Sequence, residues 1–271
     1  MSYYGIPFNV ASGGSFTWPR VFYGAGWPDE SDCAAAGAQG AVVSPCDTVA
    51  APVMPVPASP LVEGGISTAS GDHHLLVVDA DGCRLWELFA ATPHPGGGWD
   101  VASTATWDLA SSALRPAGWT SADAAGLPIL PLLLRASEAR SGTIRHALRF
   151  TLPNARIRNT SVWPARHRIG AVTSADAVPM GQLFRLRASY AIPPTFGAQS
   201  KAILQAMKTY GMYLADAGST WYVQGEPSAD WDPRVFDEVQ TVRTSDLEAV
   251  DLSQFTSRSG FDVNSARVPM P

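Results

Sequence analysis

The sequence predicts a mainly β fold: a β-sandwich or barrel-like single domain with one packed helix at about residues 198–210. Composition is the first reason, because only 16% of the 271 residues are charged and Gly (24) and Pro (22) are plentiful. Such a composition is typical of many short strands joined by turns. The second reason is a hairpin pattern at residues 74–89, and the third is that a single stretch shows convincing helical periodicity.

The hairpin is the clearest local element, with apolar strands at 74–79 and 83–89. The Asp-Gly pair between them predicts a two-residue turn of the primed type, because glycine tolerates a positive φ. This register pairs Leu76 with Glu87 and places His74 on the face that Glu87 shares. Further strands are predicted at 103–108, 143–151, 162–163, 182–191, 212–215 and 221–224.

The predicted helix ends at Gly211, a residue suited to a helix C-terminus. We expect one β-rich domain over residues 1–252, because all-β sandwiches and barrels often reach this length as one unit. Its part at 1–62 is rich in Pro and Gly and is predicted to be mostly loop, and the polar tail at 253–271 is predicted to have little order. The apolar face of the helix comprises Ile203, Leu204, Met207 and Tyr210.

Charge and hydropathy argue against two classes of partner. The net charge of −5 and the lack of a Lys/Arg cluster argue against nucleic acid, which requires a basic surface. The same charge disfavours anionic membranes, and no apolar run reaches the roughly 18 residues of a membrane helix. The opening residues, Met1–Gly5, have neither the basic region nor the apolar region of a signal peptide.

Cysteine usage leaves two interpretations open. Cys33 and Cys46 lie in an irregular Gly/Ala/Pro-rich stretch, where a disulfide would stabilise the fold by about 3 kcal/mol. The alternative is a pair of free thiols in a reducing compartment. Cys83 begins a predicted strand and is expected to be a buried thiol. The five histidines and three cysteines show no zinc-type spacing.

Several motifs, taken in order, resemble a family of secreted β-rich proteins from bacteria and fungi. The resemblance runs from about Gly5 to Asp251 and implies secretion and a compact β domain, but no particular activity. Members of that family have a longer N-terminal region with a leader, which leaves open whether Met1 is the native start. The motifs are Gly71–Asp79 (GDHHLLVVD), Leu85–Phe89 (LWELF), Leu114–Pro128 (LRPAGWTSADAAGLP), Ile144–Phe150 (IRHALRF), Pro164–His167 (PARH), Tyr210–Met212 and Trp221–Tyr222.

The first candidate site combines three histidines and a glutamate with two arginines. His146 falls on the apolar face of its predicted strand, where an imidazole has to be hydrogen-bonded or used in function. Converging His and Glu side chains would suit a divalent metal, or general acid and base catalysis near neutral pH. The commoner alternative is that each histidine is simply a satisfied core residue. The members of this set are His74, Glu87, His146, His167, Arg149 and Arg166.

The second candidate site is the polar loop at 115–128. Loops that hold polar groups on a rigid scaffold often line binding sites. Asp123 is its candidate catalytic residue, and Trp119 is suited to stacking on a sugar ring, as is Trp221 elsewhere. Nine Trp residues favour glycan binding through aromatic stacking. In the alternative interpretation the loop closes one end of the fold, and most tryptophans belong to the core.

These observations predict a secreted enzyme that cleaves a polysaccharide or oligosaccharide. In a glycoside hydrolase Glu87 and Asp123 would be the paired carboxylates. In a lyase a histidine would abstract the proton α to a uronate, while Arg149 or Arg166 neutralised the carboxylate. Two alternatives remain: a non-catalytic glycan-binding or surface assembly protein, with self-association a further option, and a metal-dependent enzyme. Dispersal of the histidines would favour the non-catalytic protein, and convergence in a cleft would favour an enzyme.

Overall fold

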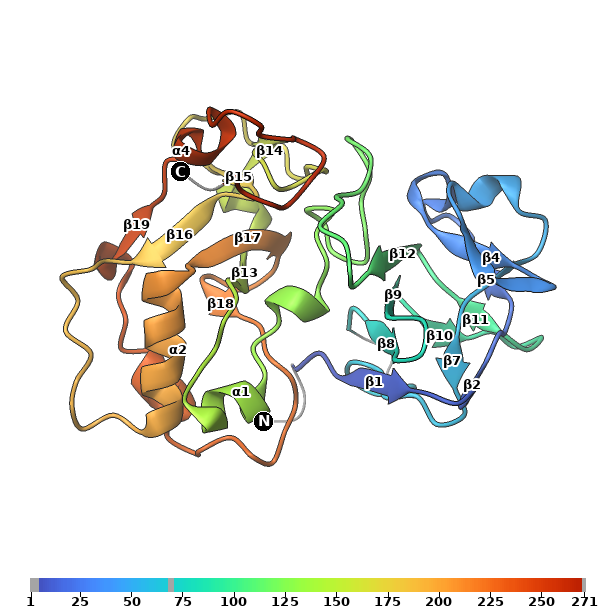
Figure 1. The fold of residues 1–271 in the computed structure, drawn as a ribbon, viewed down its shortest axis with the longest axis horizontal. Helices are drawn as coiled ribbons and strands as arrows, with labels where there is room; N and C mark the ends of the chain where they lie inside the picture. Colours follow the sequence, from blue (N-terminus) through green and yellow to red (C-terminus); the bar gives the residue numbers. More distant parts are fainter. Residues whose placement is uncertain (1–4, 68–70, 270–271) are drawn as a thin grey trace.

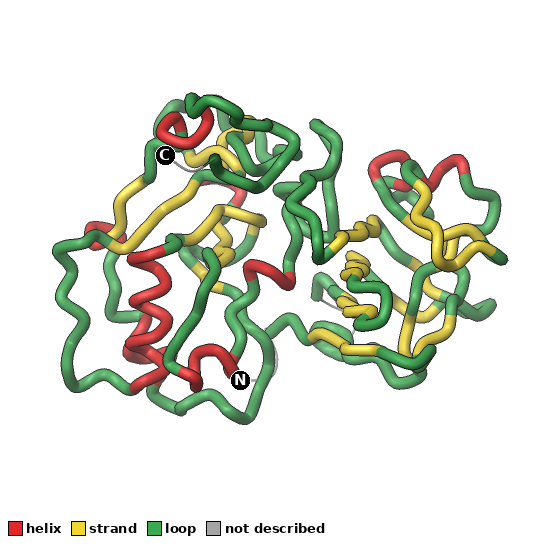
Figure 2. The backbone as a smooth tube through the Cα atoms, viewed as in Figure 1, coloured by secondary structure: helices red, strands yellow, loops and turns green. Residues whose placement is uncertain are grey.

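The computed structural model describes residues 5–67 and 71–269, which form two lobes lying side by side (Figure 1). The mainly β class with one packed helix is confirmed: short strands and loops dominate, and α2 (Ala198–Thr209) is the longest described helix (Figure 2). Among the described residues, none of the helices has the length and apolar character needed to cross a bilayer.

The N-terminal lobe is organised around a four-stranded sheet of order β1-β8-β9-β12. The predicted hairpin forms β8 and β9, and Leu76 pairs with Glu87 as the sequence indicates. Leu75 and Trp86 point into the lobe's own core, whereas Leu76 packs against the segment that joins the lobes. The strands are β1 (Phe8–Ala11), β8 (Leu75–Asp79), β9 (Arg84–Phe89) and β12 (Ser103–Asp108).

Small sheets complete this lobe, and the Cys33–Cys46 disulfide joins two of its segments. The predicted disulfide is therefore present, and both cysteines are buried in the core of the lobe. The remaining elements here are β2 (Phe16–Thr17), β3 (Val21–Phe22), η1 (Pro28–Glu30), β4 (Cys33–Ala35), β5 (Ala38–Val43), η2 (Cys46–Thr48), β6 (Pro52–Val53), β7 (Val56–Pro57), β10 (Thr92–Pro93) and β11 (Trp99–Asp100).

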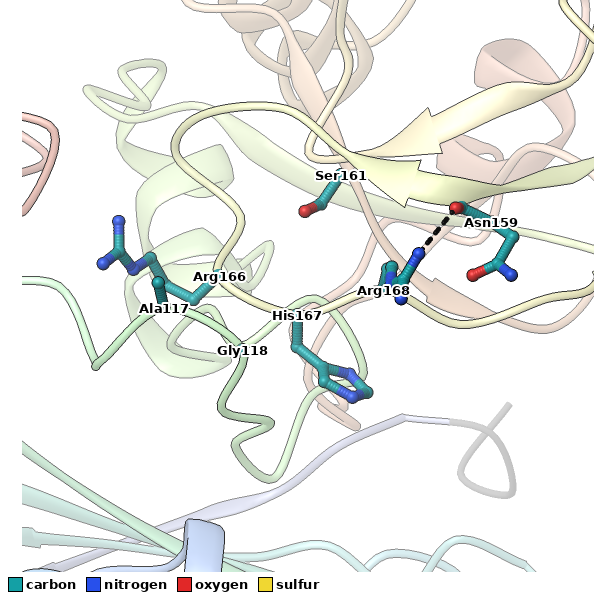
Figure 3. Close-up of a pocket in the computed structure, with 7 residues that line it drawn as sticks. All are labelled: Ala117, Gly118, Asn159, Ser161, Arg166, His167 and Arg168. Atoms are coloured by element: carbon teal, nitrogen blue, oxygen red, sulfur yellow. Dashed lines mark hydrogen bonds between the residues drawn. The ribbon is translucent and has the colours of Figure 1, made fainter. Parts of the chain in front are cut away.

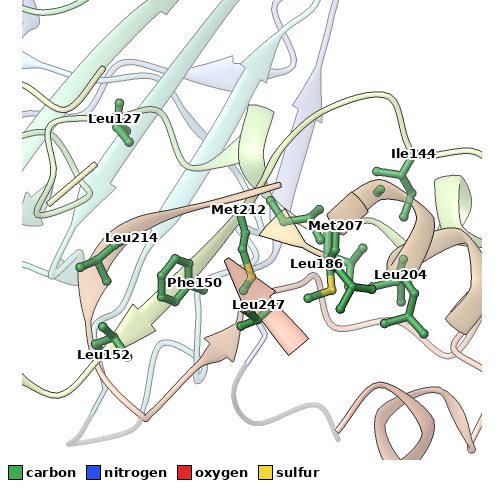
Figure 4. Packing of buried hydrophobic residues seen from close by; sticks show 14 of the residues in the cluster. Leu127, Ile144, Phe150, Leu152, Leu186, Leu204, Met207, Met212, Leu214 and Leu247 are labelled. Carbon is green, nitrogen blue, oxygen red and sulfur yellow. The ribbon is translucent and has the colours of Figure 1, made fainter. Parts of the chain in front are cut away.

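The C-terminal lobe contains a five-stranded mixed sheet, of order β18-β13-β17-β16-β19, against which α2 packs. Phe150, Met212 and Leu214 lie in the core between these elements (Figure 4). The elements are η3 (Leu130–Leu132), α1 (Ala136–Ser141), β13 (Leu148–Leu152), η4 (Asn154–Arg156), β14 (Ile157–Ser161), β15 (Val178–Met180), β16 (Leu183–Leu186), β17 (Met212–Ala217), β18 (Tyr222–Val223), α3 (Val235–Val239), η5 (Thr244–Asp246), β19 (Leu247–Ala249) and α4 (Ser253–Thr256).

The lobes meet in an apolar seam, which we define as the buried cluster of Ile6, Leu76, Ala122, Ile129 and Leu133. Near the start of the chain, the Ile6 backbone N–H donates to the carbonyl of Gly225 at 3.0 Å. A β-carbon on Gly5 would lie 2.6 Å from the nitrogen of Pro227, so only glycine permits this approach. The first described residues thus pack on the C-terminal lobe before the chain enters the N-terminal one.

The hairpin turn differs from the prediction. Gly82 does not take a positive φ; Cys83 does, at 50°, and its side chain is exposed rather than buried. The Gly82 N–H donates to the Asp79 carboxylate at 3.0 Å, and a β-carbon on Gly82 would lie 2.4 Å from that side chain. Glycine is needed at position 82 because the Asp79 side chain folds back over the turn, and not because of a positive φ as the sequence predicts.

Other predicted boundaries also require correction. The strand predicted at 143–151 begins only at Leu148, because α1 and its Gly142 cap precede it. The tail after Leu252, predicted to have little order, is held to the rest of the molecule by polar and aromatic contacts. The Leu114 N–H donates to the Asn264 carbonyl, and the Trp163 ring meets Phe261 edge to face. The strand predicted at 162–163 lies earlier, in β14, and the one predicted at 182–191 is shortened to β16.

Candidate functional site

The three predicted catalytic histidines do not converge. His74 lies in the seam region, where Nε2 is 2.9 Å from the Ala122 carbonyl. His146 is not on a strand; its Nε2 is 3.0 Å from the Glu138 carboxylate on α1. His167 lies on a surface loop, with Nδ1 2.9 Å from the Ala124 carbonyl. Each imidazole has a separate partner, so the metal site predicted from His74, Glu87, His146 and His167 is not assembled.

Arg149 and Asp123 form a buried ion pair at the centre of the molecule. Both side chains have 0% exposure, and Arg149 Nη2 donates to Asp123 Oδ2 at 2.7 Å. The Arg149 Nε and Nη1 atoms have no partner among the described residues, and Asp216 lies 3.8 Å from Nη2. Burial raises the pKa of Asp123, while the Arg149 guanidinium acts in the opposite direction. The predicted catalytic aspartate therefore joins the loop at 115–128 to β13.

Glu87 is also fully buried and serves a similar structural purpose. Its carboxylate accepts hydrogen bonds from the backbone of Ile129 at 2.9 Å and Leu130 at 3.0 Å. The Trp107 indole N–H donates to it at 3.0 Å. Burial raises the pKa of Glu87 to about 7, although these donors pull it down. Since neither Glu87 nor Asp123 has an exposed side chain, they do not form the open carboxylate pair that a glycosidase needs.

His74 instead has a partner that the sequence did not indicate. Its Nδ1 lies 2.5 Å from the Glu63 carboxylate, and Glu63 precedes the hairpin in a loop without periodicity. Asp72 lies close by, and one potential ligand atom from each of the three residues falls within 4.8 Å of the others. Burial works to lower the pKa of His74, but the Glu63 carboxylate raises it overall.

The aromatic residues predicted to bind sugar already have protein partners. The Trp119 ring lies 5.5 Å from the guanidinium carbon of Arg115, which also pairs with Asp32. The Trp221 ring stacks on Phe150 at 4.9 Å with an interplanar angle of 9°, within the core of the C-terminal lobe. Trp221 is therefore a packing residue, and one face of Trp119 is covered by a cation.

An open pocket lies where the sequence motif at 114–128 meets the motif at 164–167. A pocket of about 510 Å³ brings together the loop at 115–128 and the segment 159–168 (Figure 3). None of its described lining residues is acidic. Arg168 is exposed there, and its Nη1 donates to the Asn159 carbonyl at 3.3 Å. The lining residues are Ala117, Gly118, Asn159, Ser161, Arg166, His167 and Arg168.

Arg166 holds the pocket wall and does not present its charge to the pocket. Its Nε donates to the Arg115 carbonyl at 2.6 Å, and Nη1 and Nη2 donate to Val263 and Asn264 at 2.9 Å each. In Figure 3 its guanidinium points away from His167 and Arg168. These bonds join the two loop motifs and the C-terminal tail, so Arg166 fixes the shape of the pocket. The predicted substrate contact is thus a positioning residue.

His167 is the predicted residue that remains available at this pocket. If its Nδ1–H donates to the Ala124 carbonyl, as the 2.9 Å distance indicates, Nε2 carries the lone pair. No partner for Nε2 is found in the described part of the chain. His167 is half-buried, next to the exposed Arg168.

No family model, curated protein or solved structure matches this chain.

Proposed function

We propose that this is an extracellular carbohydrate-binding protein whose ligand is an acidic polysaccharide. The observation that carries the proposal is the pocket beside Arg168, whose described lining combines polar and basic side chains and lacks carboxylates. The Cys33–Cys46 disulfide supports an oxidising, extracellular location. Polysaccharides that contain uronic acids are a major class of extracellular polyanion.

The pocket offers the groups that a uronate residue requires. An exposed arginine binds a carboxylate through two parallel N–H donors. Ser161 and Asn159 add a hydroxyl and an amide that suit the sugar hydroxyls. Because Arg166 already fixes the surrounding loops, little conformational entropy is lost when a ligand binds.

A glycan-binding function fits the dispersal of the histidines better than a glycoside hydrolase does. The carboxylates proposed for hydrolysis, Glu87 and Asp123, have 0% exposure and are held by backbone and Arg149 donors. An extended polymer in the pocket would not reach them without unfolding the loop that covers them. Hydrolysis by this pair is therefore not proposed.

Polysaccharide β-elimination at the same pocket is a second candidate, favoured by the tautomer of His167. Neutral Nε2 would take the proton α to the uronate carboxylate while Arg168 stabilises the negative charge that develops. The freed electron pair forms a C4–C5 double bond as the C4–O4 bond breaks, and the departing oxygen takes a proton from water. This step consumes no oxidant or metal.

Calorimetric binding to polygalacturonate and alginate, with neutral dextran as the comparison, tests the proposal. We expect binding to the acidic polymers alone, and Arg168→Ala should weaken it about tenfold, or about 1.4 kcal/mol. Arg185→Ala is the matched control, because Arg185 is an exposed arginine on β16 and does not line the pocket. The proposal is refuted if the protein binds neither acidic polymer. It is also refuted if Arg168→Ala and Arg185→Ala change the affinity for the polymer equally.

The same samples distinguish binding from cleavage. A lyase generates unsaturated uronate ends, which absorb in the ultraviolet. If product forms, His167→Ala should abolish it while polymer binding persists. If the wild-type protein binds the polymer but forms no product, β-elimination is excluded and the binding proposal stands.

A further inference from the structure

We propose that Glu63, Asp72 and His74 form a binding site for a divalent first-row transition metal ion, with Zn²⁺ as the expected occupant. This inference does not depend on the polysaccharide proposal. Among the described residues, these three bring potential ligand atoms within 4.8 Å of one another. One imidazole and two carboxylates match the donors that bind zinc in proteins.

Local structure holds the two contributing segments together. Glu63 lies in the loop that follows β7, whereas Asp72 and His74 immediately precede β8. The Glu63 backbone N–H donates to the His74 carbonyl at 3.0 Å, and the His74 N–H reaches the Glu63 carboxylate at 3.4 Å. The two segments are thus joined by backbone contacts in addition to any bound ion.

The His74 ring is oriented as a metal ligand would be. Its Nε2 is 2.9 Å from the Ala122 carbonyl, which accepts the proton of that nitrogen. Nδ1 therefore faces the carboxylates, and a backbone carbonyl on the second ring nitrogen is the usual support of a histidine ligand. His74 is buried, whereas Asp72 is exposed, so an ion can enter from solvent on the Asp72 side.

Charge around the cluster also favours a cation. Asp216 and Arg149 both act electrostatically on His74, in opposite directions. The cluster itself contributes two carboxylates and one imidazole, and a divalent ion bound by them would compensate the negative charge of the carboxylates, as metal ions do in carboxylate-rich sites.

The donor set also selects between metals. Calcium takes six to eight oxygen ligands and has little use for an imidazole. Zinc accepts nitrogen and oxygen donors in a four-coordinate site, and three protein ligands leave one position for water or a ligand. In the structure His74 Nδ1 and the Glu63 carboxylate contact each other directly, with the atoms that would both bind the ion.

Titration of chelator-treated protein with Zn²⁺, Mn²⁺ and Ca²⁺ tests the proposal, with heat and thermal unfolding as readouts and mass spectrometry for stoichiometry. We expect one Zn²⁺ per chain, an increase in Tm with Zn²⁺, and a smaller response to Mn²⁺. Asp72→Asn should weaken Zn²⁺ binding at least about tenfold, since a neutral amide is a poorer ligand. Its side chain is exposed, so the fold tolerates the change.

Asp176→Asn provides the matched control, because Asp176 is another exposed aspartate and is not part of the cluster. Its Zn²⁺ affinity should equal that of the wild type. The proposal is overturned if the wild-type protein binds no stoichiometric Zn²⁺, or if Asp72→Asn binds as tightly as Asp176→Asn. It is equally overturned if Ca²⁺ stabilises the protein more than Zn²⁺ does, since that would indicate an all-oxygen site without His74.

Discussion

The two lobes bury their apolar cores in different ways. In the C-terminal lobe, a continuous sheet and α2 enclose a large cluster of Leu, Met and Phe side chains. In the N-terminal lobe, strands of two to six residues are divided among small sheets, and the core is built from Val, Ala, Cys and Trp. The comparison teaches that a lobe whose strands are divided among four sheets, and which has no α-helix among its described residues, must obtain order from other bonds.

In the N-terminal lobe those bonds are covalent and polar. The disulfide ties β4 to η2, and the Thr104 hydroxyl donates to the Asp32 carbonyl at 2.6 Å. The Thr106 N–H donates to the Asp32 carboxylate at 3.0 Å. These bonds hold separate segments of the N-terminal lobe together, as the hydrogen bonds between strands do in the C-terminal sheet. Between the lobes, Arg149 on β13 and Glu87 on β9 bond to the connecting segment, at the Asp123 carboxylate and the Ile129 backbone.

The largest expected effect is at the ion pair between β13 and the loop at 115–128, in the segment that joins the lobes. Arg149→Met leaves Asp123 buried without its partner, and we expect the free energy of unfolding in urea to fall by about 3–5 kcal/mol. Amide hydrogen exchange should accelerate in both lobes. Combining it with Asp123→Asn should restore part of the loss, because position 123 then carries no buried charge without a partner. An effect below about 1 kcal/mol, or one confined to the C-terminal lobe, would show that the pair does not couple the lobes.

The next effect should be confined to the N-terminal lobe. Replacing both Cys33 and Cys46 by Ala removes a cross-link between residues 13 apart in sequence. We expect a loss of about 3 kcal/mol, mostly through the greater freedom of the unfolded chain. Hydrogen exchange should accelerate in β4, β5 and β6 more than in α2. Equal acceleration in the two lobes would contradict the view that the disulfide compensates for the division of this lobe into small sheets.

The third effect is a pH dependence centred on Glu87. Its pKa rises from 4.5 to about 7 on folding, so between these values the folded state retains a proton that the unfolded state releases. The contribution of Glu87 to the free energy of unfolding should therefore decrease as pH rises through this window, by at most about 1.4 kcal/mol per pH unit. Urea unfolding of Glu87→Gln should show a flatter dependence. Leu88→Ala on the same strand should destabilise the protein yet keep the original slope, and identical slopes in all three proteins would refute the assignment.

The smallest effect is expected on the surface of the regular lobe. Arg185 pairs with Glu248 at 2.6 Å between β16 and β19, with about half of its side chain exposed. Because solvent screens such pairs, Arg185→Ala should change the free energy of unfolding by less than about 1 kcal/mol. A larger loss in urea denaturation would show that the C-terminal sheet also depends on polar contacts, which would weaken the contrast between the lobes.

Local patterns predicted those parts of the fold that depend on neighbours in sequence. The hairpin register and α2 follow from residues that are close along the chain, and both are confirmed. The strand predicted at 143–151 starts too early, because the run at 143–147 has β-like alternation, whereas the helix end at Gly142 depends on α1. The site at Glu63 was missed because a loop has no periodicity that would mark it.

The candidate catalytic residues were recognised as unusual, but their partners were not. Glu87 bonds to Ile129 and Leu130, and Asp123 bonds to Arg149, across distances in sequence that no local pattern encodes. Polar residues within apolar strands signal that a partner exists. Only the tertiary arrangement decides whether that partner is a substrate, a metal or the backbone of another segment.

The bond between Ile6 and Gly225 has a consequence for the order in which the molecule is completed. During synthesis Ile6 is made long before Gly225, because the two residues are far apart in sequence. The contact cannot form until Gly225 is made, and such long loop closures are slow steps in folding. The contact between Ile6 and Gly225 is therefore among the contacts that a growing chain completes late, after the strands of the N-terminal lobe have been made.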